Sequence, residues 1–161
     1  MRANFKPIGI IHSPHHSVEG MPIQARFAKG VKGSIELREE FIPGLVDLDG
    51  FSHLILIYWF HKSQGYNLEV TPFLDNKSHG VFSTRAPKRP NSIGISVVKL
   101  LNIDNHVLEI ENVDILSGTP LLDIKPYIRE FDVHETEKEG WFSAQGNNLQ
   151  DKKSDGRFCK K

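Results

Sequence analysis

The longest apolar run in this chain is LILIYWF, from Leu54 to Phe60, and it is seven residues long. β-Branched and aromatic residues dominate it, and such residues favour strands. A run of this length fits a buried strand and is about a third of what a membrane-spanning helix needs. It is apolar without alternation, which predicts a central strand covered on both faces. No segment has the spacing of an amphipathic helix of three turns, so the chain is expected to be mainly β.

Shorter strands are predicted on both sides of this run. FKPIGIIHSP indicates a first strand, and GSIELREEF alternates Ile35 and Leu37 with polar neighbours. The residues VFST are expected to form another short strand. The stretch IGISVVKLLNIDNHVLEIE alternates like a hairpin with its turn at Asp104 to His106. The spacing of the turn signals predicts a barrel or sandwich of about six to eight strands, with few short helices.

Charge and cysteine content narrow the class of protein further. Twenty cations balance twenty acids in 161 residues, so an anionic partner has to be held by a local patch. The single cysteine, Cys159, excludes an internal disulfide and suits a reducing, cytoplasmic environment. The eight histidines lack zinc-site spacing, so no metal is expected. The N-terminal apolar run is too short for a signal peptide. GVKG, at Gly30, lacks the GxGxxG pattern, so no Rossmann fold is expected.

The composition turns polar near residue 135. Residues 1–135 are therefore expected to form one β-barrel domain. Residues 136–161 are predicted to be a loosely structured tail, on which Trp141 and Phe142 are the side chains able to dock.

The loop TRAPKRPN concentrates three cations directly before a predicted strand. They are Arg85, Lys88 and Arg89. Pro87 and Pro90 restrict the backbone and favour an extended path, so the guanidinium groups are presented at little entropic cost. Guanidinium groups bind carboxylates and phosphates bidentately, which predicts an anion site. A solvated basic turn is the alternative.

Three further segments carry candidate side chains. In SGTPLLDIKPY, Asp123, Lys125 and Tyr127 fall on one face of an extended chain. His61 and Lys62 end the most apolar strand, and strand ends beside loops commonly hold sites. PIQAR, residues 22–26, offers an amide and a guanidinium from a loop. A structural role with surface charges is the alternative for each segment.

Three strings, FSHLILIYWFHKS, GVFSTRAPKRPNSIGISVVKL and VDILSGTPLLDIKPY, resemble the TsaA/TrmO (YaeB-like) family. Its members are S-adenosylmethionine-dependent tRNA methyltransferases that act on the exocyclic nitrogen of threonylcarbamoyl-adenosine beside the anticodon. The resemblance runs from about Phe5 to Tyr127. It implies an antiparallel β-barrel and a homodimer with the cofactor near the subunit interface.

The resemblance also implies site residues. The cofactor contacts fall on Gln24, Ala25, Arg26, His61, Lys62, Arg85, Ile95, Leu116, Ser117, Gly118 and Thr119. Lys88, Arg89 and Asn91 are expected to contact tRNA. Asp123 or Tyr127 is the candidate for the base that accepts the proton of the methylated nitrogen.

The chain departs from the family pattern at two places in these strings. Ser117 stands where the family usually has aspartate, so one carboxylate is missing. Ser92 follows RPN where a second proline is more usual. Only about thirty residues follow KPY. Two other functions remain open: a non-catalytic cofactor- or RNA-binding barrel, and a methyltransferase of a small amine, which the neutral net charge favours.

Overall fold

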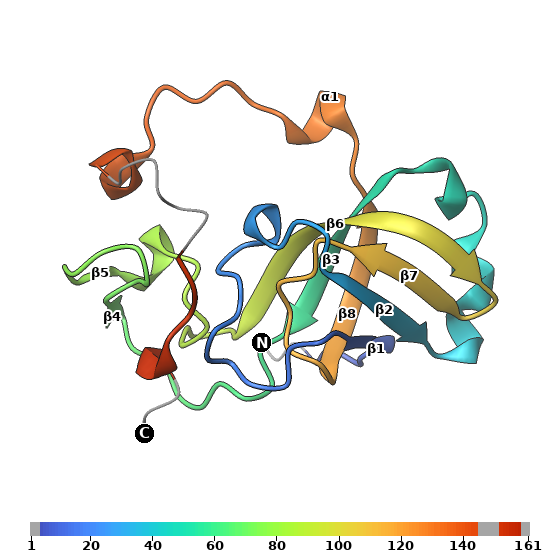
Figure 1. The fold of residues 1–161 in the computed structure, drawn as a ribbon, viewed down its shortest axis with the longest axis horizontal. Helices are drawn as coiled ribbons and strands as arrows, with labels where there is room; N and C mark the ends of the chain where they lie inside the picture. The colour runs from blue at the N-terminus through green and yellow to red at the C-terminus, as the bar shows by residue number, and fades with distance from the viewer. Residues whose placement is uncertain (1–3, 145–151, 159–161) are drawn as a thin grey trace.

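The computed structural model describes residues 4–144 and 152–158, so Cys159 lies outside the described residues. Its main feature is a closed antiparallel barrel with the strand order β1-β2-β7-β6-β3-β8 (Figure 1). The barrel strands are β1 (Gly9–His12), β2 (Lys32–Leu37), β3 (His53–Trp59), β6 (Ile93–Asp104), β7 (Val107–Glu111) and β8 (Thr119–Pro126). The predicted mainly β barrel with short helices is confirmed.

Strand β3 shows how the sequence fills the barrel. Leu54, Leu56 and Tyr58 point inward and are buried, whereas Trp59 is 47% exposed. The prediction of a strand covered on both faces is wrong, because the barrel wall is a single layer whose outer side has no second sheet. Alternation was hidden in the sequence because the outward positions of β3 are apolar too.

The inward residues of the other strands complete the core. They are fully buried, and packing them together removes the apolar surface that drives folding. This set includes Ile11, Ile35, Val98, Leu108, Ile110 and Leu121. Strands β6 and β7 form the predicted hairpin, with Asn105 in the left-handed region (φ 52°) at its tight turn.

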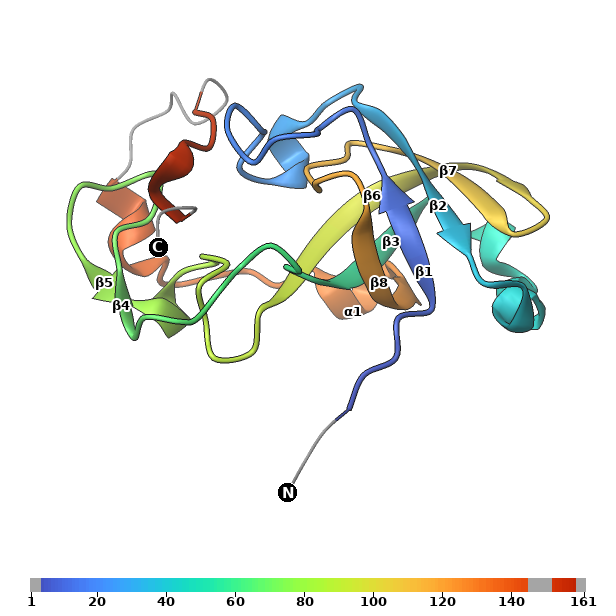
Figure 2. The ribbon, with the colours of Figure 1, turned by 90° about the horizontal axis from the view of Figure 1, so that it is seen from below.

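A smaller lobe projects from one end of the barrel (Figure 2). It holds the two-stranded sheet β4 (Glu69–Val70) and β5 (His79–Gly80), followed by a 3-10 helix at Val81–Ser83. The short strand expected at VFST is therefore wrong. Here the Ser83 hydroxyl donates to the Gly80 carbonyl and the Thr84 hydroxyl to the Val81 carbonyl, which satisfies a helical turn instead.

Short helices fill the connections. The turn-rich stretch IPGLVDLDGF lies within two 3-10 helices and the residues that flank them. The structure also has one four-residue α-helix, α1 (Arg129–Asp132). The 3-10 helices lie at Ala25–Phe27, Glu39–Leu45, Leu48–Gly50, Val81–Ser83, Gly140–Ala144 and Gly156–Phe158. No helix among residues 4–144 and 152–158 is long and apolar enough to cross a membrane.

The described part of the tail packs against the rest of the molecule. Trp141 stacks on His79 with ring centroids 4.8 Å apart, and its indole N–H donates to the Ser83 carbonyl at 2.8 Å. Residues 152–158, which we call the C-terminal strap, lie between the lobe and the loop that follows β1 (Figure 2). The Ser154 hydroxyl donates to the Val18 carbonyl at 2.6 Å. The tail thus contacts both the lobe and the loop that follows β1.

Phe158 anchors the strap. Its ring meets Phe73 edge to face at 4.9 Å and packs against the small lobe core that contains Val70 and Val81. Replacing Phe158 with alanine should detach the strap, so trypsin should cleave after Lys152 and Lys153 faster than in the wild type. Phe131→Ala, at a 70% exposed ring outside the strap, is the control. Equal cleavage rates in all three proteins would contradict this role.

Candidate functional site

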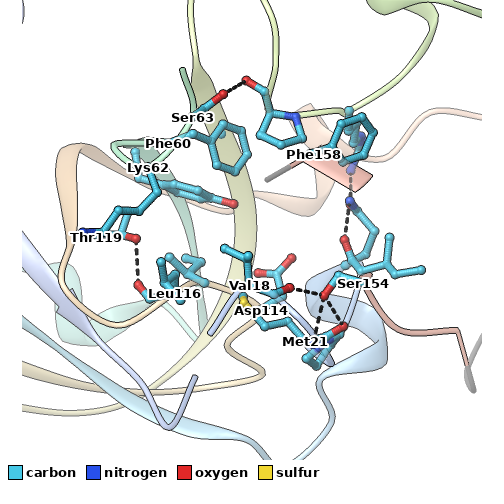
Figure 3. Close-up of a pocket in the computed structure, with 18 of the residues that line it drawn as sticks. Val18, Met21, Phe60, Lys62, Ser63, Asp114, Leu116, Thr119, Ser154 and Phe158 are labelled. Carbon is cyan, nitrogen blue, oxygen red and sulfur yellow. Dashed lines mark hydrogen bonds between the residues drawn. The ribbon is translucent and has the colours of Figure 1, made fainter. Parts of the chain in front are cut away.

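A cavity of about 770 Å³ opens between the barrel end, the lobe and the strap (Figure 3). Its volume is in the range of sites for cofactors and small molecules. Five separate regions line it: the loop after β1, the end of β3 with the start of β6, the lobe with its basic loop, the segment between β7 and β8, and the strap. The fold therefore builds one pocket from residues far apart in the sequence.

The structure brings most of the predicted site residues to this pocket. Those that line it are Gln24, His61, Lys62, Arg85, Arg89, Asn91, Ile95, Leu116 and Thr119. These residues lie between positions 24 and 119 of the sequence. The closed barrel and the lobe bring them together in space.

The other predicted contacts do not line the pocket of this chain. Ala25 is buried, whereas Arg26 and Gly118 are exposed, and none of the three lines the pocket. Ser117 turns to the N-terminal segment, where its hydroxyl oxygen accepts the Ser13 N–H at 3.2 Å. Lys88 is partly buried and lies outside the lining.

Asp123 and Tyr127 also lie away from the pocket. A register shift between Ile57 and Tyr58 leaves Asp123 opposite Ile57 on the outer face of the barrel. There it forms an ion pair with Lys125, with Nζ–Oδ2 at 2.8 Å. Tyr127 packs near His53, at the other end of β3 from the pocket. The base role of these two residues stays a sequence prediction without support from their placement.

The basic loop is tighter than the sequence predicts. The Arg89 N–H donates to the Pro87 carbonyl at 3.0 Å, so the chain turns sharply between the two prolines. The Arg89 guanidinium then reaches back to the Thr84 carbonyl at 3.1 Å. The expected extended path is wrong, because the turn centres on Lys88, which precedes neither proline and therefore lacks their bias towards an extended backbone.

Arg85 is held at the pocket by a different contact. Its Nη1 donates to Oε1 of Gln24 at 2.7 Å. The Gln24 amide in turn donates to the Ile23 carbonyl at 2.9 Å. The loop after β1 thus orients a guanidinium from the lobe, and a charged group fixed in this way is a good site for a carboxylate.

His61 lies at the mouth of the same pocket. Burial, and the charge of the adjacent Lys62, lower the pKa of its imidazole. The ring is therefore neutral at physiological pH.

Asp114 is a pocket residue that the sequence reasoning missed. It lies between β7 and β8, where the hydroxyl of Ser96 donates to its Oδ1 at 2.6 Å. Burial raises the pKa of Asp114 to about 6. The available signal was an acid between two apolar residues, Val113 and Ile115, both of which are buried.

Tyr58 and Phe60 form an aromatic wall of the pocket. Their rings meet edge to face at 5.3 Å. The Tyr58 hydroxyl lies 3.1 Å from the Ser96 hydroxyl. Burial, and next the negative charge of Asp114, raise the pKa of the Tyr58 phenol, so it stays protonated at neutral pH.

The strap completes the pocket with Ser154, Asp155 and Phe158. Figure 3 shows Phe158 and Ser154 on one side of the hollow, with Phe60 and Lys62 across from them. None of the three was predicted, because this part of the tail carries no periodic pattern. Their contribution depends on long-range contacts such as the Arg157 guanidinium donating to the Pro72 carbonyl at 2.6 Å.

The chemistry of the lining suits a ligand with both charges and a flat ring. Arg85, Arg89 and Lys62 provide positive charge, Asp114 provides a recessed carboxylate, and aromatic rings provide an apolar surface. Within residues 4–144 and 152–158 no three His, Cys, Asp or Glu side chains come together as a metal site. The pocket therefore fits a zwitterionic cofactor with an aromatic base.

The chain matches the family model described as the tRNA-methyltransferase O N-terminal domain over residues 10–133. A probable S-adenosyl-L-methionine-binding protein of Pyrococcus abyssi is 51% identical over 154 residues, covering 96% of this chain and 84% of that protein. A tRNA (adenine(37)-N6)-methyltransferase of Mus musculus is 34% identical over 134 residues, covering 79% of this chain and 31% of that protein.

Solved structures agree with the sequence matches. The crystal structure of TrmO from Pseudomonas aeruginosa superposes with a TM-score of 0.73 at 35% identity, covering 88% of this chain. A second TrmO crystal structure gives a TM-score of 0.76 at 37% identity. This chain spans 63% and 64% of those two solved chains. The family model ends at residue 133, so the strap lies beyond the matched domain.

Proposed function

Because this chain belongs to the family of the tRNA-methyltransferase O N-terminal domain, we propose that it transfers a methyl group from S-adenosylmethionine to tRNA. The acceptor is the exocyclic nitrogen of threonylcarbamoyl-adenosine next to the anticodon. The observation that carries this proposal is that Gln24, His61, Arg85 and Thr119 line one and the same pocket. All four are positions at which the family resemblance predicts cofactor contacts.

The lining residues match the chemical groups of this cofactor. S-adenosylmethionine supplies an activated methyl group on a sulfonium, next to an amino-acid end and an adenine. Arg85, oriented by Gln24, is positioned for the carboxylate of the amino-acid end. Tyr58 and Phe60 offer an apolar wall for a flat base. Holding the reactants in one geometry supplies much of the rate of a displacement reaction.

The RNA side of the proposal rests on the basic loop. Arg89 and Asn91 line the pocket from the lobe, and Lys88 lies beside them. The anticodon loop brings phosphates, and the modified base brings a threonyl carboxylate. Local cations of this kind are what a chain with no net charge needs to hold RNA. The proposal includes a cytoplasmic location, where tRNA is available as a substrate.

Replacing Arg85 with alanine should weaken S-adenosylmethionine binding about tenfold or more, because a charge-assisted hydrogen bond is worth roughly 1.5–3 kcal/mol. Lys88→Ala, in the same loop but outside the pocket lining, should change the affinity much less. Isothermal titration calorimetry on both variants measures the difference. Equal and small effects would remove Arg85 from the cofactor site.

We further propose that the protein acts as a homodimer. Trp59, Ile95 and Val97 are 47%, 51% and 36% exposed on the outer face of β3 and β6. Exposed apolar groups on neighbouring strands are typical of interfaces. Ile95 also lines the pocket, so a second copy on this face would lie next to the cofactor.

Ile95→Lys should shift the protein from dimer to monomer in light scattering, because it buries a charge in an apolar interface. The control is Ile10→Lys, at a 44% exposed position on β1, which pairs with β2 and β8 only. A monomeric wild type would contradict the homodimer.

The function is tested by methyl transfer from labelled S-adenosylmethionine to tRNA isolated from cells that lack this protein. Nucleoside mass spectrometry should show one added methyl group on threonylcarbamoyl-adenosine. Calorimetry with S-adenosylmethionine and with its demethylated product should show binding of both. Binding without transfer would favour the non-catalytic barrel. Transfer to a small amine but not to tRNA would favour a methyltransferase of a small amine.

A further inference from the structure

Two acids line the pocket among the described residues, and they differ in their surroundings. Asp155 on the strap is held by Arg157, with Nη2–Oδ2 at 2.7 Å. Asp114 is partly buried and accepts a hydrogen bond from the Ser96 hydroxyl at 2.6 Å. Figure 3 shows the Asp114 side chain directed into the hollow. Asp114 therefore presents a carboxylate to the ligand space from inside the barrel end.

A chain of hydrogen bonds fixes this carboxylate. Ser96 has one hydroxyl proton and gives it to Asp114, so the Tyr58 hydroxyl has to donate to Ser96. Strand pairing sets these positions, because Tyr58 lies opposite Gly94 and Leu56 lies opposite Ser96 in the β3–β6 ladder. The two hydroxyl groups orient the carboxylate, and neither of them carries a charge.

The charged groups around Asp114 leave it a moderate base. Burial raises its pKa to about 6, whereas the Ser96 hydrogen bond, the backbone N–H of Ala25 and the charge of Arg85 act in the opposite direction. The other titratable side chains that line the pocket are Tyr58, Lys62, Arg89, His61, His16 and Asp155. A base with a pKa near the working pH combines the unprotonated form with a useful affinity for a proton.

We infer that Asp114 is the general base of the proposed methyl transfer, accepting the proton of the nitrogen that is methylated. This inference rests on the proposed function. As the new nitrogen–carbon bond forms, the bond between the methyl carbon and the sulfonium sulfur breaks, and its electron pair stays on sulfur as the thioether. The nitrogen proton passes to the Asp114 carboxylate and then to solvent. Atoms and charge balance without another reactant.

The other candidate bases fit less well. His61 lies beside Lys62, and burial and that charge lower its pKa, so it is a weaker proton acceptor than an ordinary imidazole. Tyr58 is protonated and already donates its proton. Asp123 is paired with Lys125 on the outside of the barrel. Asp114 combines access to the pocket with a free capacity for a proton.

The test compares Asp114→Asn with Asp104→Asn, which changes an exposed acid at the β6–β7 turn. Asp114→Asn keeps the shape and the Ser96 contact, so the affinities for S-adenosylmethionine and for its demethylated product should stay within about threefold. Its turnover on saturating substrate should fall about a hundredfold or more. Asp104→Asn should match the wild type in both.

A second readout does not depend on activity. Carbon-13 NMR of labelled aspartate side chains, with Asp114→Asn assigning the signal, should give a midpoint near pH 6 for this carboxyl group. Wild-type turnover should lose activity below the same pH, and this acidic limb should be missing from the residual turnover of Asp114→Asn.

Two results would overturn the inference. The first is unchanged turnover of Asp114→Asn at saturating substrate; if its affinities for cofactor and product fell at the same time, Asp114 would be a binding group for the ammonium. The second is loss of turnover in Asp123→Asn with Asp114→Asn active. If the wild-type protein transfers no methyl group, the proposed function itself is contradicted. That result differs from a failure of the Asp114 inference, in which the wild type is active.

Discussion

Replacing Gly94 with alanine should lower the free energy of unfolding by about 1–3 kcal/mol and reduce the cofactor affinity as well. A Cβ at this position would lie 2.3 Å from Cε2 of Tyr58 and 2.8 Å from Cζ of Phe60. Both rings line the pocket, and Gly94 is the inward residue paired with Tyr58. Relief of the clash has to move the aromatic wall, so stability and binding change together.

Chemical denaturation and calorimetry measure these two effects. The matched control is Gly44→Ala, because a Cβ at Gly44 meets no atom within 4 Å. That variant should keep the wild-type affinity and a free energy of unfolding close to the wild-type value. If Gly94→Ala behaved like Gly44→Ala, the packing of Tyr58 over β6 described here would be incorrect.

Replacing Asp114 with asparagine should stabilise the ligand-free protein at neutral pH. The folded pKa of about 6 exceeds the ordinary 3.8, so between these values the folded chain keeps a proton that the unfolded chain has released. The free energy of unfolding of the wild type therefore falls as the pH rises through this window. The difference corresponds to about 3 kcal/mol at most, and solvent in the pocket reduces it, so we expect about 1–3 kcal/mol.

Urea denaturation at pH 4 and at pH 7.5 measures this effect. The variant and the wild type should be nearly equal in stability at pH 4, where the Asp114 carboxyl is protonated in the folded chain, and should diverge at pH 7.5. Asp104→Asn should not produce this divergence. If Asp114→Asn were less stable than the wild type at pH 7.5, the carboxylate would stabilise the ligand-free protein. That result would contradict the destabilising effect expected from its burial.

The barrel could be predicted because its signals are local. Alternation in β2 and in the β6–β7 hairpin appears directly in the sequence, and apolar residues such as Ile35 and Leu108 are buried as that pattern requires. Strand β3 was misread because exposed Trp59 and its outward neighbours are apolar as well. Those residues lie on the outer surface of the barrel. In the sequence, their hydrophobicity does not distinguish them from core residues.

The pocket could be predicted only in part. The family resemblance pointed to Gln24, His61 and Arg85, and the fold brings them together. It did not point to Asp114, whose importance comes from burial and from its contact with Ser96, 18 residues away. The strap was missed for the same reason, because Phe158 meets Phe73 through a long-range contact that no sequence period reports.

The most direct test of the account uses two tRNAs that differ only in the threonylcarbamoyl group next to the anticodon. The purified protein is incubated with labelled S-adenosylmethionine and each tRNA, and the nucleosides are analysed by mass spectrometry. We predict one methyl group on the threonylcarbamoyl-adenosine of the first tRNA and none on the second. Equal labelling of both tRNAs, or labelling of neither, would contradict the assignment of this pocket to methyl transfer on the modified base.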